Sequence, residues 1–219
     1  MQKNEEKRIV SQLSKEFSIL SQAWKMVELE YGTIDKWGLN ATDTGTKDND
    51  NNPIYDKSAA SIISERLRKH LNVAKVCQDG EMCQTRSLYT LSGHKLSDAT
   101  PAGGSSATPA DASFFLNDGT FVSIGWYDSS KEKNDFNVSL PGFNKDILGK
   151  TRFTFNISKD GVLPEGSLKT IDSWRNNCNL TNNSVHGGRG CTAWVIYNKN
   201  LDYLHCRNDL SWDGKTKCD

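Results

Sequence analysis

The residues best suited to chemistry in this sequence are its cysteines and histidines. Six cysteines are present, and His70, His94, His186 and His205 are scattered along the chain. No CxxC motif and no Cys/His quartet with zinc-finger spacing occurs. His205-Cys206 could act as a Cys–His pair, but a cysteine from an even, clustered set is better used in a disulfide. We therefore expect no enzymatic activity and assign no catalytic or metal-binding residue.

The cysteines fall into three close pairs along the chain, a pattern typical of disulfides, which form outside the cytosol. They are Cys77, Cys83, Cys178, Cys191, Cys206 and Cys218. Six cysteines allow fifteen connectivities, of which we favour the three sequential pairs. Cys77–Cys83 is the most strongly indicated because few residues separate the two. Short loops limit the stabilisation to roughly 2–3 kcal/mol per disulfide in the chain-entropy model.

Two other motifs resemble ligand sites by composition alone. The glycine-rich run 187–190 does not precede an expected helix and lacks the Lys-Ser/Thr of a P-loop, so it does not predict phosphate binding. The Asp/Asn-rich run 48–53 has the composition of a calcium loop. It lacks the glycine and the closing glutamate of an EF-hand, so a solvated loop is the better interpretation.

The charge balance excludes some partners. The chain has 219 residues, with 27 Lys+Arg and 27 Asp+Glu, so its formal net charge is zero. A neutral chain argues against nucleic-acid binding and against strong attraction to an anionic membrane. No apolar run approaches the ~18–20 residues of a membrane helix, and no signal segment is present. Because the cysteines nevertheless indicate export, we expect that the natural N-terminus has been removed.

The longest expected element is a helix over residues 2–31. An apolar stripe recurs every three or four residues, and Gly32 provides a natural stop. Its members are Ile9, Leu13, Phe17, Leu20, Trp24, Val27 and Tyr31. Charged residues between them, Lys15 and Glu16 included, are expected on a wetted back face. A second helix is predicted over 56–76, followed by a clip closed by Cys77–Cys83.

The second half of the chain is predicted to form strands. A short strand is expected at 87–91, then a flexible loop over 92–112 that is richest in Gly, Ser and Pro between 101 and 109. Residues 113–126 predict a hairpin with an Asp-Gly turn at 118–119. A charged turn is expected at 131–135. Strands are predicted at 151–157, 162–164 and 192–197, before a loop-rich tail.

Helices first and strands second indicate an α+β fold. We predict a single domain over 1–219, with a long N-terminal helix packed on an antiparallel β-sheet. Residues 1–31 form the long helix, and 32–112 hold the second helix and loops. Residues 113–219 contain the sheet and a disulfide-bonded C-terminal lobe.

Three segments, in this order, resemble type IV pilin-like proteins: the pilins and type II secretion pseudopilins, and most closely prepilin-type proteins of gut bacteria. The first is the helix segment 13–23. The second is 142–155, which is similar to the family's Gly-x-Asn…Gly-x-x-x-Phe-x-Phe strand entry. The third is 190–196 with the later Cys206, similar to the family's C-terminal cystine segment. Together they cover less than half of the chain. The family's leader, processing site and apolar run are not in the sequence, which would begin just after them.

The resemblance implies a structural subunit of a type IV pilus or type II secretion-like filament. Its partners would be other pilin or pseudopilin subunits through the N-terminal helix, and the inner membrane through the missing upstream segment. It would then lie in a periplasmic pseudopilus or a cell-surface filament. Ile9, Leu13, Phe17, Leu20 and Trp24 would pack on the subunit's own sheet, whereas Val10, Ile19 and Met26 are candidates for neighbour contacts.

The alternative is a secreted, lectin-like carbohydrate- or adhesion-binding module. Tryptophans can stack on sugars, and the candidates are Trp126, Trp174, Trp194 and Trp212. Cys191 and Trp194, with Cys206, Trp212 and Cys218, resemble the end of a C-type lectin-like domain. No cofactor is expected. Calcium is the exception to consider, because Asp118, Asp160 and Asp213 each precede a glycine, as in some pseudopilin loops, although plain turns explain them as well.

Overall fold

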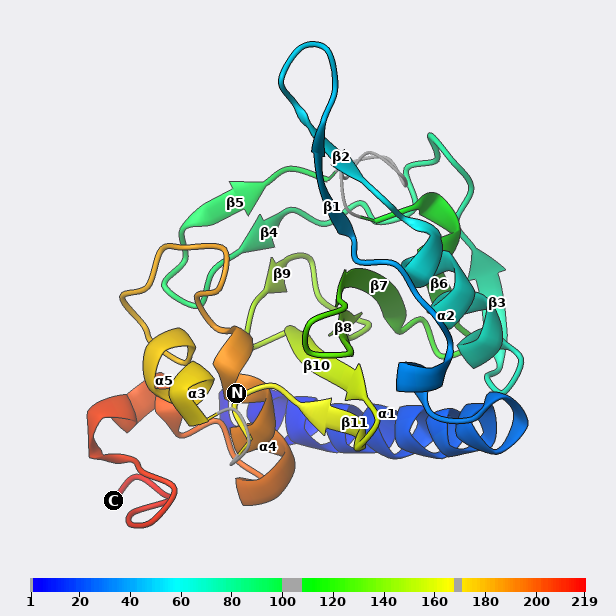
Figure 1. The fold of residues 1–219 in the computed structure, drawn as a ribbon. Helices are drawn as coiled ribbons and strands as arrows, with labels where there is room; N and C mark the ends of the chain where they lie inside the picture. Colours follow the sequence, from blue (N-terminus) through cyan, green and yellow to red (C-terminus); the bar gives the residue numbers. More distant parts are fainter. Residues whose placement is uncertain (1, 100–107, 168–170) are drawn as a thin grey trace.

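The apolar stripe at the start of the chain forms helix α1 (Gln2–Tyr31), which runs along one edge of the molecule (Figure 1). The structure is a computed structural model and describes residues 2–99, 108–167 and 171–219. Gly32, with φ of 75°, ends the helix and donates its backbone N–H to Glu28 at 2.9 Å. Both ends of α1 are thus where the sequence predicts them.

An antiparallel sheet of six strands, ordered β11-β10-β8-β7-β6-β3, packs against this helix in the described part of the chain. Its strands are β3 (Val73–Val76), β6 (Ser113–Leu116), β7 (Phe121–Asp128), β8 (Lys133–Ser139), β10 (Arg152–Ser158) and β11 (Gly161–Pro164). Every neighbouring pair is antiparallel. The α+β fold with a long helix on an antiparallel sheet is therefore confirmed.

One face of the sheet is apolar and forms the core with α1. Alternation along β10 places Phe153, Phe155 and Ile157 on this face, all fully buried, as the sequence predicts. Register pairs Phe155 with Phe136 and Phe153 with Val138 on β8. The opposite face carries the polar alternates of the same strands, and loops cover part of it.

The expected hairpin forms β6 and β7, but the strand after it was not predicted. Residues expected as a charged turn at 131–135 already enter β8 at Lys133, a central strand. The inward positions of β8 are Asn134, Phe136 and Val138, and because the first of these is polar the apolar period is weak in the sequence. Asn134 Nδ2 donates to the carbonyls of Gly125 and Trp126, where the β7–β8 register shifts.

The second helix was predicted to end about two turns later than it does. Helix α2 spans Ser58–Arg68, and β3 (Val73–Val76) then pairs with β6. β-Branched Val73 and Val76 favour the strand, and edge pairing with β6 satisfies their backbone groups, so tertiary pairing overrides the helical period. Cys77, at the end of β3, donates its backbone N–H to Ser113 at 2.9 Å.

Two small sheets lie above the large one (Figure 1). Strands β1 (Asp43–Lys47) and β2 (Pro53–Tyr55) form a protruding hairpin, where only a loop was expected. Its tip is the exposed run 48–52, in which Asp48 accepts backbone hydrogen bonds from Asp50 and Asn52. Strands β4 (Leu88–Tyr89), β5 (Lys95–Ser97) and β9 (Asp146–Ile147) form the other.

The loop predicted over 92–112 thus contains β5 and the short 3-10 helix η2 (Ala110–Ala112). Its Gly/Ser-rich centre, residues 100–107, lies outside the described residues. A further 3-10 helix, η1 (Ile34–Lys36), follows α1 and buries Ile34.

The C-terminal lobe is helical where a strand was expected. Residues 192–197, predicted as a strand, lie in helix α4 (Thr192–Asn198). The other helices are α3 (Ile171–Asn177), η4 (Arg189–Cys191), α5 (Tyr203–Cys206) and η5 (Arg207–Asp209). A short, almost entirely apolar run is compatible with a buried helix as well as with a buried strand. The strand was predicted because the run is rich in β-branched and aromatic residues. Lys199, with φ of 56°, ends α4.

Candidate functional site

Helix α1 is the element that the sequence predicts to contact other subunits, and its apolar stripe faces the sheet. Ile9, Leu13, Leu20 and Trp24 are each 0% exposed. Phe17 is half-buried, and its ring stacks on that of Phe155 with centroids 5.8 Å apart. The five residues predicted to pack on the subunit's own sheet therefore belong to its core.

The first half of α1 is also held from the C-terminal lobe. Nε2 of His205 lies 3.0 Å from Oε1 of Glu6, and Lys199 donates to the hydroxyl of Ser14 at 3.1 Å. Figure 1 shows α4 lying against this part of the helix. α1 thus contacts both the sheet and the disulfide-bonded lobe.

Glu16 is buried, although its position predicted a wetted face. Its side chain is 1% exposed, and Lys15 Nζ lies 3.3 Å from Oε1. Oε2 is buried without a hydrogen-bond partner among the described residues. Burial, together with the neighbouring Asp118 carboxylate, raises the pKa of Glu16 to about 7. The helix therefore carries a carboxyl group that is largely protonated below neutral pH.

The solvent face of α1 carries two large apolar side chains near its C-terminal end. Met26 is 50% exposed and Leu29 is 81% exposed. Ile19, about two turns before Met26, is half-buried. Val10 packs against the core and is therefore less available than the sequence suggested. Leu29 was missed, although it stands three residues after Met26 and continues the same face.

The six cysteines form the three sequential disulfides, as predicted. These are Cys77–Cys83, Cys178–Cys191 and Cys206–Cys218. Such bonds persist in oxidising compartments, which indicates an extracytoplasmic protein. No helix in the described part of the chain is long and apolar enough to cross a membrane.

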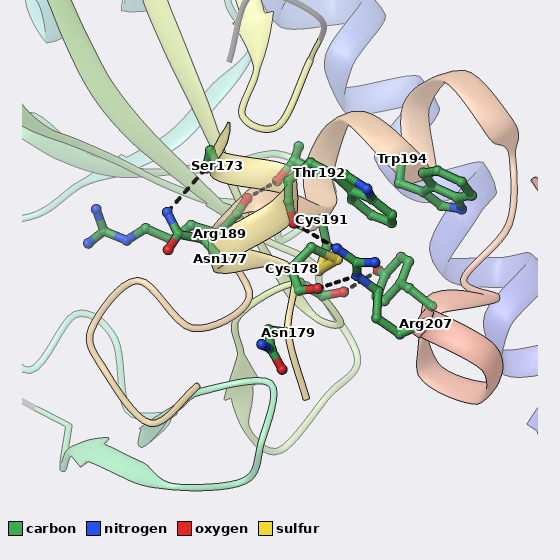
Figure 2. The surroundings of a disulfide bond; sticks show 12 residues. Ser173, Asn177, Cys178, Asn179, Arg189, Cys191, Thr192, Trp194 and Arg207 are labelled. Atoms are coloured by element: carbon green, nitrogen blue, oxygen red, sulfur yellow. Dashed lines mark hydrogen bonds between the residues drawn. A yellow bond between two sulfur atoms is a disulfide. The ribbon is translucent and has the colours of Figure 1, made fainter. Parts of the chain in front are cut away.

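Cys178–Cys191 lies near Trp194 (Figure 2), which belongs to a cluster of tryptophans in the lobe. The indoles of Trp174 and Trp194 stack with centroids 4.2 Å apart, and Trp212 packs on Trp194 at 5.2 Å. Arg207 lies over Trp174 at 4.1 Å and donates hydrogen bonds to the backbone carbonyls of Trp174 and Cys178. Trp174 and Trp194 are buried and so cannot stack on a sugar in this state. Among the four candidates, only Trp126, at 38%, counts as exposed.

The glycine-rich run 187–190 allows backbones to meet closely. A Cβ added at Gly190 would lie 2.1 Å from the carbonyl oxygen of Ser173, and one at Gly188 would lie 2.2 Å from that of Leu148. The run leads into η4 and α4, whereas the sequence placed no helix after it. Its glycines are therefore explained by packing between the sheet and the lobe.

The outer face of the sheet holds a buried charged cluster that sequence reasoning missed. Asp146 is 1% exposed, and it pairs with Arg86 Nε at 3.3 Å and Arg152 Nη1 at 3.4 Å. The hydroxyl of Ser139 donates to Asp146 at 2.9 Å. Burial lowers the pKa of Arg152 from its usual value. The only sequence signal was polar alternation on the strands, which does not reveal which loops cover them.

No group of three or more His, Cys, Asp or Glu side chains that could hold a metal comes together within residues 2–99, 108–167 and 171–219. Of the three aspartates considered for calcium, Asp118 is engaged by Lys15 and by the backbone N–H of Thr120. Plain turns stay the interpretation that the sequence favours for these aspartates.

Comparison with known proteins places the chain in a family but supplies no activity. No curated protein and no solved structure matches it. A family model described as "Family of unknown function (DUF6613)" matches residues 1–179. The chain belongs to this family.

Proposed function

For this member of a family without an assigned function, we propose the role of a pilin or pseudopilin, a structural subunit of a type IV pilus or type II secretion-like filament. The observation that carries the proposal is helix α1: 30 residues long, with one face buried on an antiparallel sheet and apolar side chains on its other face. Three disulfides agree with assembly outside the cytosol. On this proposal the protein works by packing and carries out no chemistry.

The exposed face of α1 supplies the proposed subunit contact. Met26 and Leu29 lie about one helical turn apart, so they form one small apolar surface that the monomer leaves in water. Burying two such side chains against a neighbour would contribute roughly 1.5–3 kcal/mol each. The helix is proposed to continue upstream into an apolar membrane segment that inserts in the inner membrane before assembly.

Photo-crosslinking in cells tests this role. A photo-reactive amino acid replaces Leu29 in the full-length chain, expressed from its own gene, and a matched chain carries it at Ile54, which is 44% exposed on the β1–β2 hairpin. We expect a ladder of subunit multiples from position 29 and none from position 54. Absence of the ladder from position 29 contradicts the proposal. The upstream coding sequence gives an independent check, because a leader, a processing site and an apolar run should precede Gln2.

The second candidate is the lectin-like binding module, favoured by one surface feature. Trp126 is exposed, and its ring lies edge-on to that of Tyr55 with centroids 6.0 Å apart. An exposed indole beside a tyrosine is a suitable surface for stacking on a sugar. Glycan-array binding that is lost in Trp126→Ala would favour this role. A cleavable signal peptide before Gln2 would favour it over the pilin role.

A further inference from the structure

A cavity of about 250 Å³ lies between the outer face of the large sheet, the strands β4 and β5, and the loop before η4. Two arginines, Arg152 and Arg189, and one amide, Asn137, line it together with leucine and valine side chains. No carboxylate is part of this lining. A cavity with two guanidinium groups and no acid in its wall favours an anion.

The acid that pairs with Arg152 does not fully neutralise the arginines around it. Asp146 is shared between Arg152 and Arg86, so one negative charge faces two guanidinium groups. Asp135 lies 3.9 Å from Arg189 and also 3.9 Å from Lys133, and the nearby Glu165 adds a second negative charge to this group. The positive charges of Arg86 and Arg189 add to burial in lowering the pKa of Arg152. An incoming anion would offset the positive charge that Arg86 and Arg152 leave around Asp146.

Hydrogen-bond donors also remain unused at the cavity. Nε of Arg189 is buried and has no hydrogen-bond partner among the described residues. Asn137 accepts from the hydroxyl of Thr154 at 2.8 Å through Oδ1, which leaves its amide NH₂ to donate. Figure 2 shows the side chain of Arg189 pointing away from the Cys178–Cys191 disulfide. Unsatisfied donors in a partly buried site call for an acceptor-rich ligand.

Apart from Ser97, the remaining lining is apolar and indicates that the rest of the ligand is apolar too. Leu88, Leu96 and Leu148 contribute side chains to the cavity, and Leu148 is only 2% exposed. A fully hydrated inorganic anion would leave these side chains without a partner. We propose that this cavity binds the carboxylate group of a small organic acid with an apolar body, its carboxylate on Arg189 and Asn137 and its body on the leucines.

The proposal is independent of subunit assembly, because neither α1 nor its exposed face takes part. NMR titration of the folded, labelled chain with hexanoate tests it, and hexanamide serves as the uncharged control. We expect hexanoate to shift amide signals around Leu88, Leu96 and Arg189, and hexanamide to bind at least about tenfold more weakly. Equal binding of the two ligands, or no shifts with hexanoate, overturns the proposal.

Two variants distinguish the contribution of the positive charge to binding from that of the cavity's space. Arg189→Gln should weaken hexanoate binding about tenfold, whereas Arg175→Gln, whose side chain is 68% exposed on α3, should leave it unchanged. Leu96→Trp should abolish binding by filling the cavity without removing a charge. Unchanged affinity in Arg189→Gln contradicts the assignment. If that variant fails to fold, unchanged affinity in Leu96→Trp contradicts it instead.

Discussion

Lys15 on α1 forms an ion pair of 2.5 Å with Asp118 in the turn between β6 and β7, and the buried carboxyl of Glu16 lies beside this pair. The hydrogen bond from Lys15, with one from the backbone of Thr120, lowers the pKa of Asp118 although burial alone would raise it. Burial raises the pKa of Glu16 to about 7. The pKa values of two neighbouring acids are therefore shifted in opposite directions.

Replacing Glu16 tests this arrangement. Because its folded-state pKa is above the unfolded value of 4.5, its contribution to stability is fully present below about pH 4.5 and is lost as pH rises through about 7. Glu16→Gln should thus unfold with a free energy about 1–3 kcal/mol higher than wild type at pH 8, with the advantage shrinking towards pH 5. Urea titrations at both pH values measure it. A constant difference between the two pH values would show that the carboxyl is not the titrating group.

The three disulfides should differ in what they contribute. Cys178 and Cys191 are both fully buried, and their bond closes a loop with a sequence separation of 13, against 6 for Cys77–Cys83. Loop entropy favours the former by less than 1 kcal/mol, so the larger loss comes from the cavity left in the lobe. We expect Cys178→Ala/Cys191→Ala to cost about 4 kcal/mol and Cys77→Ala/Cys83→Ala about 2 kcal/mol. Calorimetry of the two double variants measures the loss of stability in each. Equal losses would contradict the ranking.

Gly190 should not tolerate a side chain. Its added Cβ would lie 2.1 Å from a backbone carbonyl oxygen, which only a backbone shift can relieve. Gly190→Ala should cost about 2 kcal/mol or more, which lowers the melting temperature by about 6 °C or more, or prevents folding. Gly80→Ala is the matched control, because its φ of 75° imposes strain but nothing lies within 4 Å of the added Cβ. A loss no greater than that of the control would mean that the contact relaxes easily.

Asn134 should be essential to the irregular pairing of β7 with β8. Its side-chain N–H groups satisfy two carbonyls at the point where the register shifts. Asn134→Ala leaves both carbonyls without these donors and should cost about 2–3 kcal/mol in unfolding free energy. Asn137→Ala, on the same strand but half-buried and with a single side-chain partner, should cost about 1 kcal/mol. Chemical denaturation of both variants provides the measurement.

The sequence was most informative where one period persisted over many residues. The stripe from Ile9 to Val27 spans five turns, and Phe153, Phe155 and Ile157 alternate without interruption, so α1 and β10 were predicted almost residue by residue. The disulfides followed from spacing alone. These features depend mainly on residues that are close together in the sequence.

The features that escaped prediction depend on neighbours distant in sequence. Residues 192–196 lie buried in a helix among a disulfide, a tryptophan cluster and α1, whereas Tyr197 is exposed. Glu16 is buried because the β6–β7 turn lies over it, and Asp146 is buried because Arg86 and Arg152 come from two other segments. A single sequence shows that such residues are polar, but not what the fold places over them.

The contacts at the start of α1 have a consequence for how the chain folds after export. Glu6 meets His205, 199 positions later, and Ser14 meets Lys199, 185 positions later. Contacts this far apart form late, since loop closure must precede them. A chain that crosses a membrane with its N-terminus leading can therefore pack the apolar stripe of α1 on the sheet before the lobe arrives, but it makes these two contacts only afterwards. The contacts that fasten the start of α1 thus form last, when Cys206 and Cys218 are also available to pair.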